Sequence, residues 1–276
     1  MKLQAICLLF LSWTQLAFAN PISDKFEIPP MEQSFYQYGE TREAALDPNN
    51  IKVLVWNIYK ADKKSFSSDM KKIGLGQDVL LIQEAETNQK MLNVLELFDG
   101  YQFNLGVSFV TKKTGDATGT MIGSRAEIRN FSILRTKDLE PIVETPKVVT
   151  TATFPIQGMD EELLVLNIHG LNMTENSAFI RQLLDCEKVI QKHKGPVIFA
   201  GDFNTSDIDK YNAMMNVAFR QGLFTVGFRN DKRRKSTFSR LIIDHTFVRG
   251  LKIKDADIPD LKGSDHMAMR LKLAVE

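Results

Sequence analysis

The chain has 276 residues and is a quarter charged, with 35 Lys and Arg residues against 34 Asp and Glu residues. This length suits one large α/β domain or two small ones and is enough to bury a sizeable core. The near-zero net charge argues against bulk electrostatic capture of nucleic acid, but it leaves room for a local basic rim.

The first nineteen residues have the pattern of a secretory signal peptide. Lys2 forms a short positive region, Ala5–Leu11 an apolar core, and an Ala-Phe-Ala sequence ends at Ala19. We therefore expect cleavage after Ala19 and a secreted or periplasmic mature protein. The alternative is an uncleaved membrane anchor, which the short apolar stretch disfavours because about 20 residues are needed to cross a bilayer. No later segment is long and apolar enough to span, so no stable membrane insertion is expected after cleavage.

The cysteine content excludes an internal disulfide in the mature chain. Cys7 lies in the signal segment, so Cys186 is the only cysteine left. It falls in a helical pattern of apolar residues, and we interpret it as a buried core thiol. No cluster of Cys and His residues has the composition of a zinc site.

The remaining elements follow from hydrophobic periodicity and turn signals. Prolines break residues 20–50 into an irregular N-terminal arm, and the domain proper is expected at 51–276. In chain order we expect strands at 51–57, 79–83, 102–111, 119–124, 127–134, 148–154, 163–168, 197–200, 237–249 and 267–275, with helices at 67–73, 87–98, 175–192 and 209–221. This alternation predicts layered sheets covered by helices within a single domain.

Polar residues stand at the ends of six apolar runs. They are Asn57, Glu84, His169, Asp202 with Asn204, Asp244, and Asp265 with His266. Burying such groups without partners is costly, so buried strands should not end in them by chance. Six endings made of Asn, Glu, His and Asp predict one shared, metal-dependent acid–base site.

Each of these endings also has an ordinary structural explanation. Asp202 and Asn204 could form an Asx turn that caps the next helix. His266 could be a surface histidine beside a capping Asp265. The apolar runs before these residues look like buried strands, which favours a functional site instead. A carboxylate at Glu84 beside Asn57 would suit Mg²⁺, which takes few protein oxygens and retains water.

Six short motifs occur in the order typical of one superfamily. They are Trp56-Asn57-Ile58, Gln83-Glu84, Asn167-Ile168-His169, Gly201-Asp202-Phe203-Asn204, Ile243-Asp244-His245 and Ser264-Asp265-His266. From Ile51 onward the chain resembles the endonuclease/exonuclease/phosphatase (DNase I-like) superfamily. Residues 53–60 and 232–251 are most similar to its uncharacterised YafD-like bacterial branch, which has no settled substrate. The resemblance implies an α/β fold that is a four-layer α/β/β/α sandwich, with two mixed β-sheets packed face to face and helices outside.

The resemblance also implies a metal-dependent phosphoester hydrolase. Glu84 would bind Mg²⁺, with Mn²⁺ as an alternative, and Asn57 and Asp265 would lie near the metal.

The remaining site residues would handle water and phosphate. His266 would activate water as a general base or would hold the transition-state phosphate, and Asp244 would orient it. Asp202 would position the attacking water, Asn204 would hold that water or the phosphate, and His169 would donate to a phosphoryl oxygen. A histidine near neutral pKa, oriented by an aspartate, suits this proton transfer.

Substrate contacts are expected from Arg125, at a place where the superfamily often has a substrate residue, and from two basic clusters. The clusters are Lys60, Lys63 and Lys64 after the first motif, and Lys232, Arg233, Arg234 and Lys235 before the fifth. They could be solvated loops, or they could form a positive rim for nucleic-acid phosphates or anionic lipid headgroups.

Three functions remain open at this level, all for a protein expected to be a monomer. The first hypothesis is a secreted phosphodiesterase, with a nuclease favoured. The second is an inositol-phosphate phosphatase or a sphingomyelinase-like phospholipase, for which residues 103–110 could form an exposed apolar hairpin. The third is an inactive binding module, which the complete set of polar endings disfavours. His245 is either a third site histidine or a strand residue that faces away.

Overall fold

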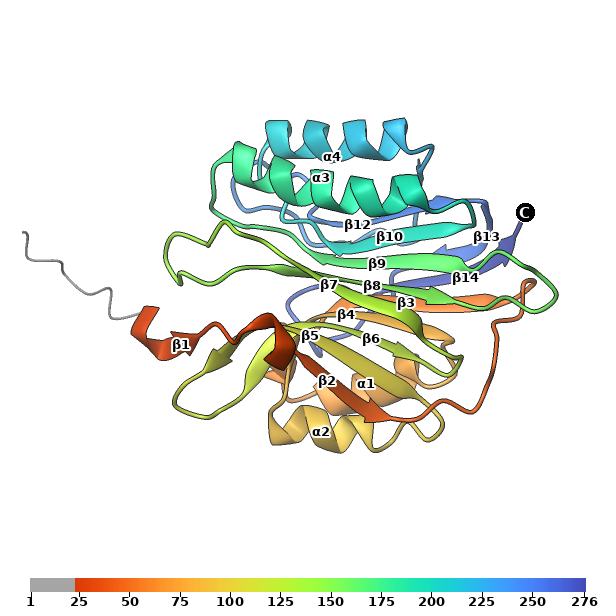
Figure 1. Ribbon diagram of the computed structural model, residues 1–276, viewed down its shortest axis with the longest axis horizontal. Helices are drawn as coiled ribbons and strands as arrows, with labels where there is room; N and C mark the ends of the chain where they lie inside the picture. The colour runs from red at the N-terminus through yellow and green to blue at the C-terminus, as the bar shows by residue number, and fades with distance from the viewer. Residues whose placement is uncertain (1–22) are drawn as a thin grey trace, which may run out of the picture.

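A computed structural model describes residues 23–276 and shows two β-sheets packed face to face between two pairs of helices (Figure 1). The expected four-layer α/β/β/α sandwich is therefore confirmed. The predicted signal peptide lies outside the described residues. None of the helices within 23–276 is long and apolar enough to cross a membrane.

The first sheet has eight strands. They are β1 (Phe26–Glu27), β2 (Phe35–Gly39), β3 (Ile51–Asn57), β4 (Val79–Glu86), β5 (Gln102–Thr111), β6 (Ala117–Ser124), β13 (Leu251–Asp257) and β14 (Met269–Val275). Their order is β1-β5-β6-β4-β3-β14-β13, and β2 pairs with β5. Strands β3 and β4 are parallel, and the other pairs are antiparallel.

The second sheet has six strands. They are β7 (Arg129–Arg135), β8 (Val148–Phe154), β9 (Leu163–His169), β10 (Val197–Asp202), β11 (Phe224–Thr225) and β12 (Asp244–Arg249). Their order is β11-β12-β10-β9-β8-β7, with β9 and β10 parallel. Each sheet thus contains one parallel pair near its centre.

Four α-helices cover the outer faces of the sheets (Figure 1). They are α1 (Phe66–Gly74) and α2 (Gln89–Leu95) on the first sheet, and α3 (Asn176–Lys192) and α4 (Ile208–Arg220) on the second. Short 3₁₀ helices occupy Ser23–Lys25, Met31–Gln33 and Tyr59–Ala61. Helix α2 is shorter than the expected 87–98 segment: Asn88 caps its start by accepting from the backbone N–H of Met91, and the helix ends at Leu95.

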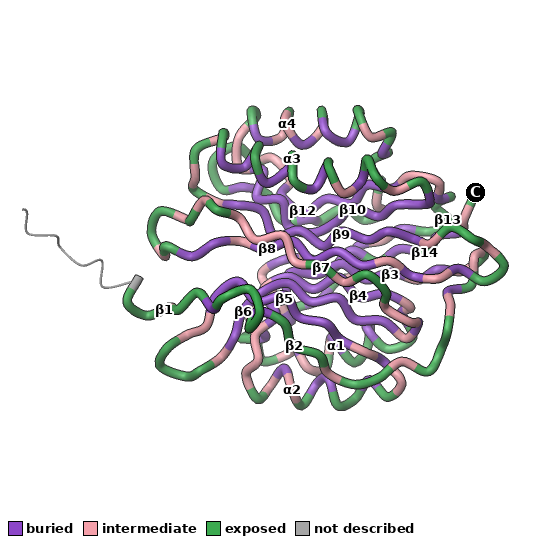
Figure 2. Tube along the Cα trace, in the orientation of Figure 1, coloured by how far each residue is buried: buried purple, intermediate pink, exposed green. Residues whose placement is uncertain are grey.

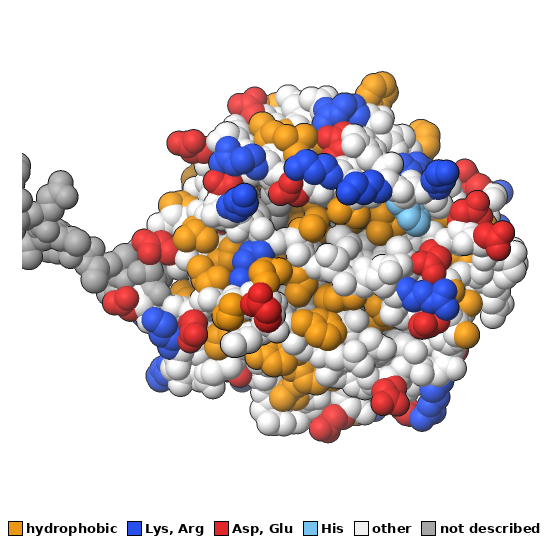
Figure 3. Space-filling view, in the orientation of Figure 1, with side chains coloured by type: hydrophobic (Ala, Val, Ile, Leu, Met, Phe, Trp, Pro, Cys, Tyr) orange, Lys and Arg blue, Asp and Glu red, His pale blue; other side chains and the backbone are white. Residues whose placement is uncertain are grey.

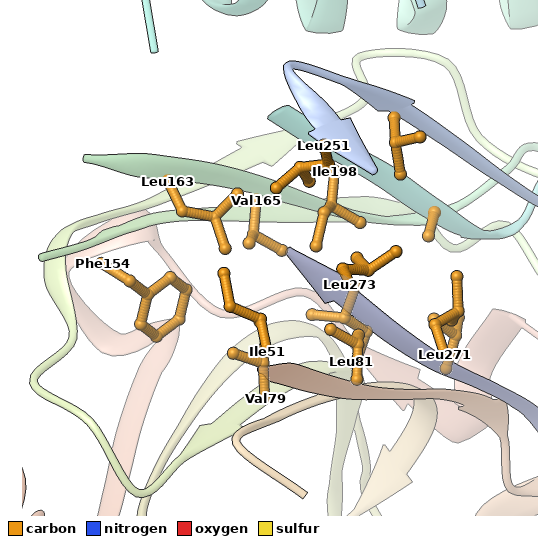
Figure 4. Packing of buried hydrophobic residues seen from close by; sticks show 14 of the residues in the cluster. Ile51, Val79, Leu81, Phe154, Leu163, Val165, Ile198, Leu251, Leu271 and Leu273 are labelled. Atoms are coloured by element: carbon orange, nitrogen blue, oxygen red, sulfur yellow. The ribbon is translucent and has the colours of Figure 1, made fainter. Parts of the chain in front are cut away.

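The hydrophobic residues form three layers that correspond to the three interfaces of the sandwich. The central layer joins the inner faces of the two sheets and includes Ile51, Leu81, Val165 and Ile198 (Figure 4). The outer layers join each sheet to its helices. Buried residues follow both sheets, and exposed residues lie on the outer faces of the helices (Figure 2). Cys186 is buried in the layer under α3, as predicted.

The surface is consistent with the balanced composition. Basic and acidic side chains are interspersed on the face shown in Figure 3, and hydrophobic side chains gather across its middle. On this face no single sign of charge dominates.

The segment expected to be an irregular N-terminal arm is instead part of the first sheet. β1 pairs with the end of β5, and β2 pairs with its beginning, from Phe35 opposite Gly106 to Gly39 opposite Gln102. The prolines around them had hidden these short strands from a periodicity argument. Residues 103–110 are likewise core strand β5, so the expectation of an exposed apolar hairpin there is wrong.

Other differences concern strands near chain reversals. The consecutive strands expected around Arg125 belong to different sheets, β6 to the first and β7 to the second. The strand expected over 237–249 begins only at Asp244. Strand β13 was missed because four successive residues, 252–255, are exposed and mostly charged, which erases its apolar signal.

Candidate active site

The site lies where the carboxyl ends of β3, β4, β9 and β10 meet at one edge of the sandwich. In the two parallel pairs, Asn57 lies opposite Gln83, and Asp202 lies opposite His169. Adjacent parallel strands end at the same edge of a sheet, which is where open α/β sheets bind ligands. Strand β1 marks this edge at the left of Figure 1, and the chain's C-terminus lies at the opposite edge.

The backbone leaves regular strand geometry where the site begins. Glu84 has φ of 53° within a register shift between Ile82 and Ala85, and this irregularity redirects its side chain. Gly201 has φ of +139°, and a Cβ atom there would lie 2.1 Å from the carbonyl oxygen of Ile168. Only glycine fits this position.

Asn57 joins carboxylates from the two sheets. Its buried Nδ2 donates to Asp202 Oδ2 at 3.0 Å and to Glu84 Oε1 at 3.2 Å. Its Oδ1 accepts from the backbone N–H of Tyr59 at 3.1 Å. One amide therefore fixes the relative positions of Glu84 on the first sheet and Asp202 on the second.

His266 and Asp244 form a buried pair. His266 Nδ1 lies 2.9 Å and 3.0 Å from the two carboxylate oxygens of Asp244. A carboxylate can only accept, so Nδ1 carries a proton and donates it. His266 Nε2 is thereby left to face the site, 3.7 Å from Asp202 Oδ2.

The backbone on both sides of this pair is held in place. The Trp56 indole N–H donates to the carbonyl of His266 at 3.0 Å. The Ser264 hydroxyl accepts from the N–H of His266 at 3.1 Å and donates to the carbonyl of Asn57 at 2.7 Å. These contacts fix the imidazole relative to the first sheet, although His266 follows a loop.

Asp202 lies at the centre of the cluster. Its Oδ2 lies 3.7 Å from His266 Nε2 and 3.8 Å from His169 Nε2. Its Oδ1 accepts from the backbone N–H of Asn204 at 2.9 Å. Two imidazoles, one amide and one backbone N–H therefore surround a single buried carboxylate.

The two histidines prefer different protonation states. Burial by itself would lower the pKa of His266, but the negative charges of Asp244 and Asp202 outweigh burial and raise this pKa above its ordinary value. Burial holds the pKa of His169 well below its ordinary value, and nearby positive charges lower it further. Burial also raises the pKa of Asp202. Near neutral pH the site therefore combines a cationic His266 with a neutral His169.

Several of these groups could hold a divalent metal. The ligand atoms of Asp202, Asp244 and His266 lie within 4.8 Å of one another. Asp244, however, already directs both oxygens at His266. The Glu84 side chain is 24 % exposed, against 3 % for Asp202, and it shares the Asn57 amide with Asp202. Glu84 and Asp202 thus best fit an ion that keeps several water ligands.

The other residue expected near the metal has a different partner. Asp265 forms an ion pair with Arg234, and its second oxygen lies 3.5 Å from the Ser264 hydroxyl. The carboxylate of Asp265 therefore pairs with Arg234 in this structure, and its expected place near the metal stays a prediction.

Arg125 lies at the wrong end of the sheet to contact a substrate. It follows Ser124, which pairs with Val79 at the amino end of β4, whereas Glu84 stands at the carboxyl end of that strand. Its guanidinium pairs with Glu43 and lies 3.8 Å from Asp78. The expected role of Arg125 is therefore wrong, because antiparallel pairing carries the end of β6 away from the site.

Arg233 is also not part of an exposed rim. It is buried, pairs with Asp231 at 2.7 Å, and donates to the carbonyl of Asp244 at 3.1 Å. It therefore holds the backbone of Asp244 in the Asp–His pair. Lys60, in contrast, lies in the site region: its Nζ is 3.5 Å from Glu86, and it lines a pocket together with Glu84 and His169.

His245 faces away from the site. Of the two alternatives left by the sequence, it is the strand residue and not a third site histidine. Its ring packs edge-on to Phe203, 5.7 Å between centroids, and its Nε2 lies 2.8 Å from the carbonyl oxygen of Ile242. Burial lowers its pKa to about 4. It is a neutral core residue.

For three residues around the site, the sequence did not predict the role that the structure gives them. Ser264 and Trp56 stand inside recognised motifs, but their backbone-holding role depends on contacts across more than 200 residues. Lys147 precedes β8, and its positive charge lowers the pKa of His169. No local sequence pattern distinguishes it from other lysines.

Acid–base groups gathered at the strand ends of a four-layer sandwich define a class of hydrolases that act on phosphoester bonds. Residues 54–266 match the model of the endonuclease/exonuclease/phosphatase family, and the chain belongs to this family. The resemblance inferred from the six motifs is thereby confirmed, and so is the assignment as a phosphoester hydrolase.

Two relatives place the chain within the family. The UPF0294 protein of Vibrio campbellii is 33 % identical over 217 residues, which cover 78 % of this chain and 74 % of that protein. The UPF0294 protein of Klebsiella pneumoniae is 31 % identical over 217 residues, which cover 78 % and 79 %. They support the expected uncharacterised YafD-like bacterial branch.

Solved structures show the same fold at lower identity. An endonuclease/exonuclease/phosphatase from Beutenbergia cavernae has a TM-score of 0.63 and 16 % identity, and the match covers 82 % of this chain and 72 % of that one. The human Nocturnin catalytic domain has a TM-score of 0.61 and 19 % identity, covering 90 % and 99 %.

Proposed function

We propose that this protein is an exported phosphodiesterase that depends on Mg²⁺, cleaves nucleic acid and acts as a monomer. The observation that carries the phosphodiesterase proposal is the buried Asp244–His266 pair, held at 2.9 Å, with its free nitrogen directed at Asp202. Support for export comes from the signal-type sequence of residues 1–19.

The residues of the site suit attack of water on a phosphodiester. The cationic form of His266 holds negative charge as it develops on the phosphoryl oxygens. Asp202, between the two histidines, is placed to orient the attacking water and receive its proton. Neutral His169 faces the same position through Nε2. A bound Mg²⁺ would act as a Lewis acid at Glu84 and Asp202.

Nucleic acid is supported by the loops around this edge. Lys63 and Lys64 follow β3, and Lys232 and Lys235 precede β12; all four are exposed. Phe238 lies in the second of these loops and is 95 % exposed. Basic side chains combined with an exposed aromatic ring suit a phosphate backbone and an unpaired base that stacks on the ring.

A lipid substrate is the second candidate, and one observation favours it. Met173, in the loop after β9, is 65 % exposed, so two loops at the site edge present large apolar tips. Apolar tips beside lysines also suit an anionic membrane surface. A phosphoinositide or sphingolipid headgroup would then reach the same site.

One experiment separates these functions. Purified residues 20–276 are incubated with single-stranded DNA, RNA, supercoiled plasmid, inositol polyphosphates and sphingomyelin vesicles, each with Mg²⁺ or with EDTA. We expect cleavage of nucleic acid with Mg²⁺ only, and loss of cleavage in His266→Ala. Cleavage confined to lipids or inositol phosphates would favour the second candidate. No cleavage of any diester would contradict the phosphodiesterase itself.

The positions of two cations that were expected to contact the substrate lead to a paired prediction. Lys60→Ala should raise KM for nucleic acid about tenfold, since one charge-assisted phosphate contact contributes roughly 1.5–3 kcal/mol in favourable cases. Arg125→Ala also removes a partly exposed, ion-paired cation, but at the opposite edge, so KM and kcat should stay within about twofold. Steady-state kinetics at low salt test both. Equal losses in the two variants would contradict this placement.

A further inference from the structure

A small pocket of about 200 Å³ adjoins the active site, and Glu84 and His169 form part of its lining. It extends toward β1, β5 and the loop at 136–147 before β8. Pockets that hold drug-sized ligands are larger, about 300–1,000 Å³. The pocket therefore suits one compact group attached close to a phosphate held by the site.

Most of the pocket wall is apolar and aromatic. The rings of Phe26 and Phe109 meet edge to face, 4.8 Å between centroids, and Val143 and Val148 complete this side. The ammonium group of Lys60 lies 5.4 Å from the Phe109 ring centroid. A flat ring would find apolar contacts here, with a cation beside the phosphate that carries the ring.

The lining also contains polar side chains. Lys147 and Glu140 line the pocket as an ion pair, 3.2 Å between Nζ and Oε2, and both side chains are partly exposed. Such groups can donate to and accept from a ligand. This favours a ring that bears hydrogen-bonding atoms over a plain hydrocarbon group.

We propose that this pocket, which we call the ring pocket (Phe26, Phe109, Val143, Thr145 and Val148), binds the nucleobase next to the scissile phosphate. The proposal rests on the phosphodiesterase function. A pocket for one ring requires that base to leave its stack, so single strands and chain ends are favoured over intact duplex.

The ring pocket also gives the N-terminal segment a role. Phe26 is carried by β1, which is held on β5 by the pairs Phe26–Thr111 and Glu27–Val110. The segment just after the predicted signal peptide is therefore a wall of the substrate site. Phe26 acts as a specificity residue that does not touch the reacting atoms.

Binding calorimetry tests the ring pocket without requiring turnover. Thymidine 5′-monophosphate, butyl phosphate and methyl phosphate are titrated into wild-type protein with Mg²⁺. We expect thymidine monophosphate to bind at least tenfold more tightly than methyl phosphate. Val143→Phe, which fills the pocket, should abolish this advantage, and Phe26→Ala should reduce it several-fold. Phe219→Ala, at a residue that is 86 % exposed on α4, is the matched control and should keep it.

Equal affinity of the wild type for methyl and thymidine phosphates would overturn the proposal even if diesters are cleaved. Butyl phosphate binding as tightly as thymidine monophosphate would overturn the nucleobase assignment. A nucleotide advantage that Val143→Phe abolishes, without diester cleavage, would support the pocket and contradict the phosphodiesterase.

Discussion

Asp244→Asn is expected to lower kcat for phosphodiester hydrolysis about a thousand-fold while the protein stays folded. Both Asp244 oxygens accept from His266 Nδ1, at 2.9 Å and 3.0 Å. An asparagine keeps one acceptor but removes the buried negative charge that favours the cationic form of His266. Losing one preorganised group that stabilises transition-state charge costs about 10²–10³ in kcat, and this change does so without emptying the site.

Kinetics and nuclear magnetic resonance together test this prediction. KM should change little, because Asp244 lies behind His266, and the pKa of His266 should fall because a buried negative charge is lost. Asp255→Asn is a matched control: Asp255 lies on the exposed middle of β13 and pairs with Arg229, and its substitution should leave kcat unchanged. A kcat in Asp244→Asn close to that of the wild type would exclude the Asp–His pair as the group that stabilises charge on the phosphoryl oxygens.

Asn167→Ala is expected to have the largest effect on stability, about 3–5 kcal/mol of the free energy of unfolding. Asn167 lies on β9, fully buried, and its Nδ2 donates to the carbonyls of Ile82 at 3.1 Å and Met121 at 3.0 Å. Its Oδ1 accepts from Gln83 Nε2 at 2.6 Å. One side chain of the second sheet thus satisfies three groups of the first. Each group left buried and unpaired costs about 1–3 kcal/mol.

Urea unfolding measures this effect against a single-bond control at the same interface. Thr120 Oγ1 donates to Thr150 Oγ1 at 3.1 Å, also between the two sheets. Thr150→Val removes that bond and should cost about 1 kcal/mol. If Asn167→Ala costs no more than Thr150→Val, the side chain does not hold the sheets together as described.

The site residues at strand ends were accessible from the sequence. An apolar run that ends in a polar residue identifies both a buried strand and the place where it stops. Asn57, Glu84, His169 and Asp202 were found in this way. Asp244 and His266 were found at the ends of shorter runs, and the order of the motifs supported them. Strand ends are encoded locally, within about six residues, so sequence alone determined these positions and the layered fold class.

The partners of these residues depend on pairing between distant segments. Arg125 seemed close to the site until antiparallel β6 carried it to the far edge, and Asp265 proved to be paired with Arg234. Phe26 joins the site only because β1 pairs with β5, about 85 residues later in the chain. Sequence by itself determined the two sheets and the chemistry of their ends. The tertiary structure decided which ends meet, because strand register and sheet packing are set by contacts that no local pattern contains.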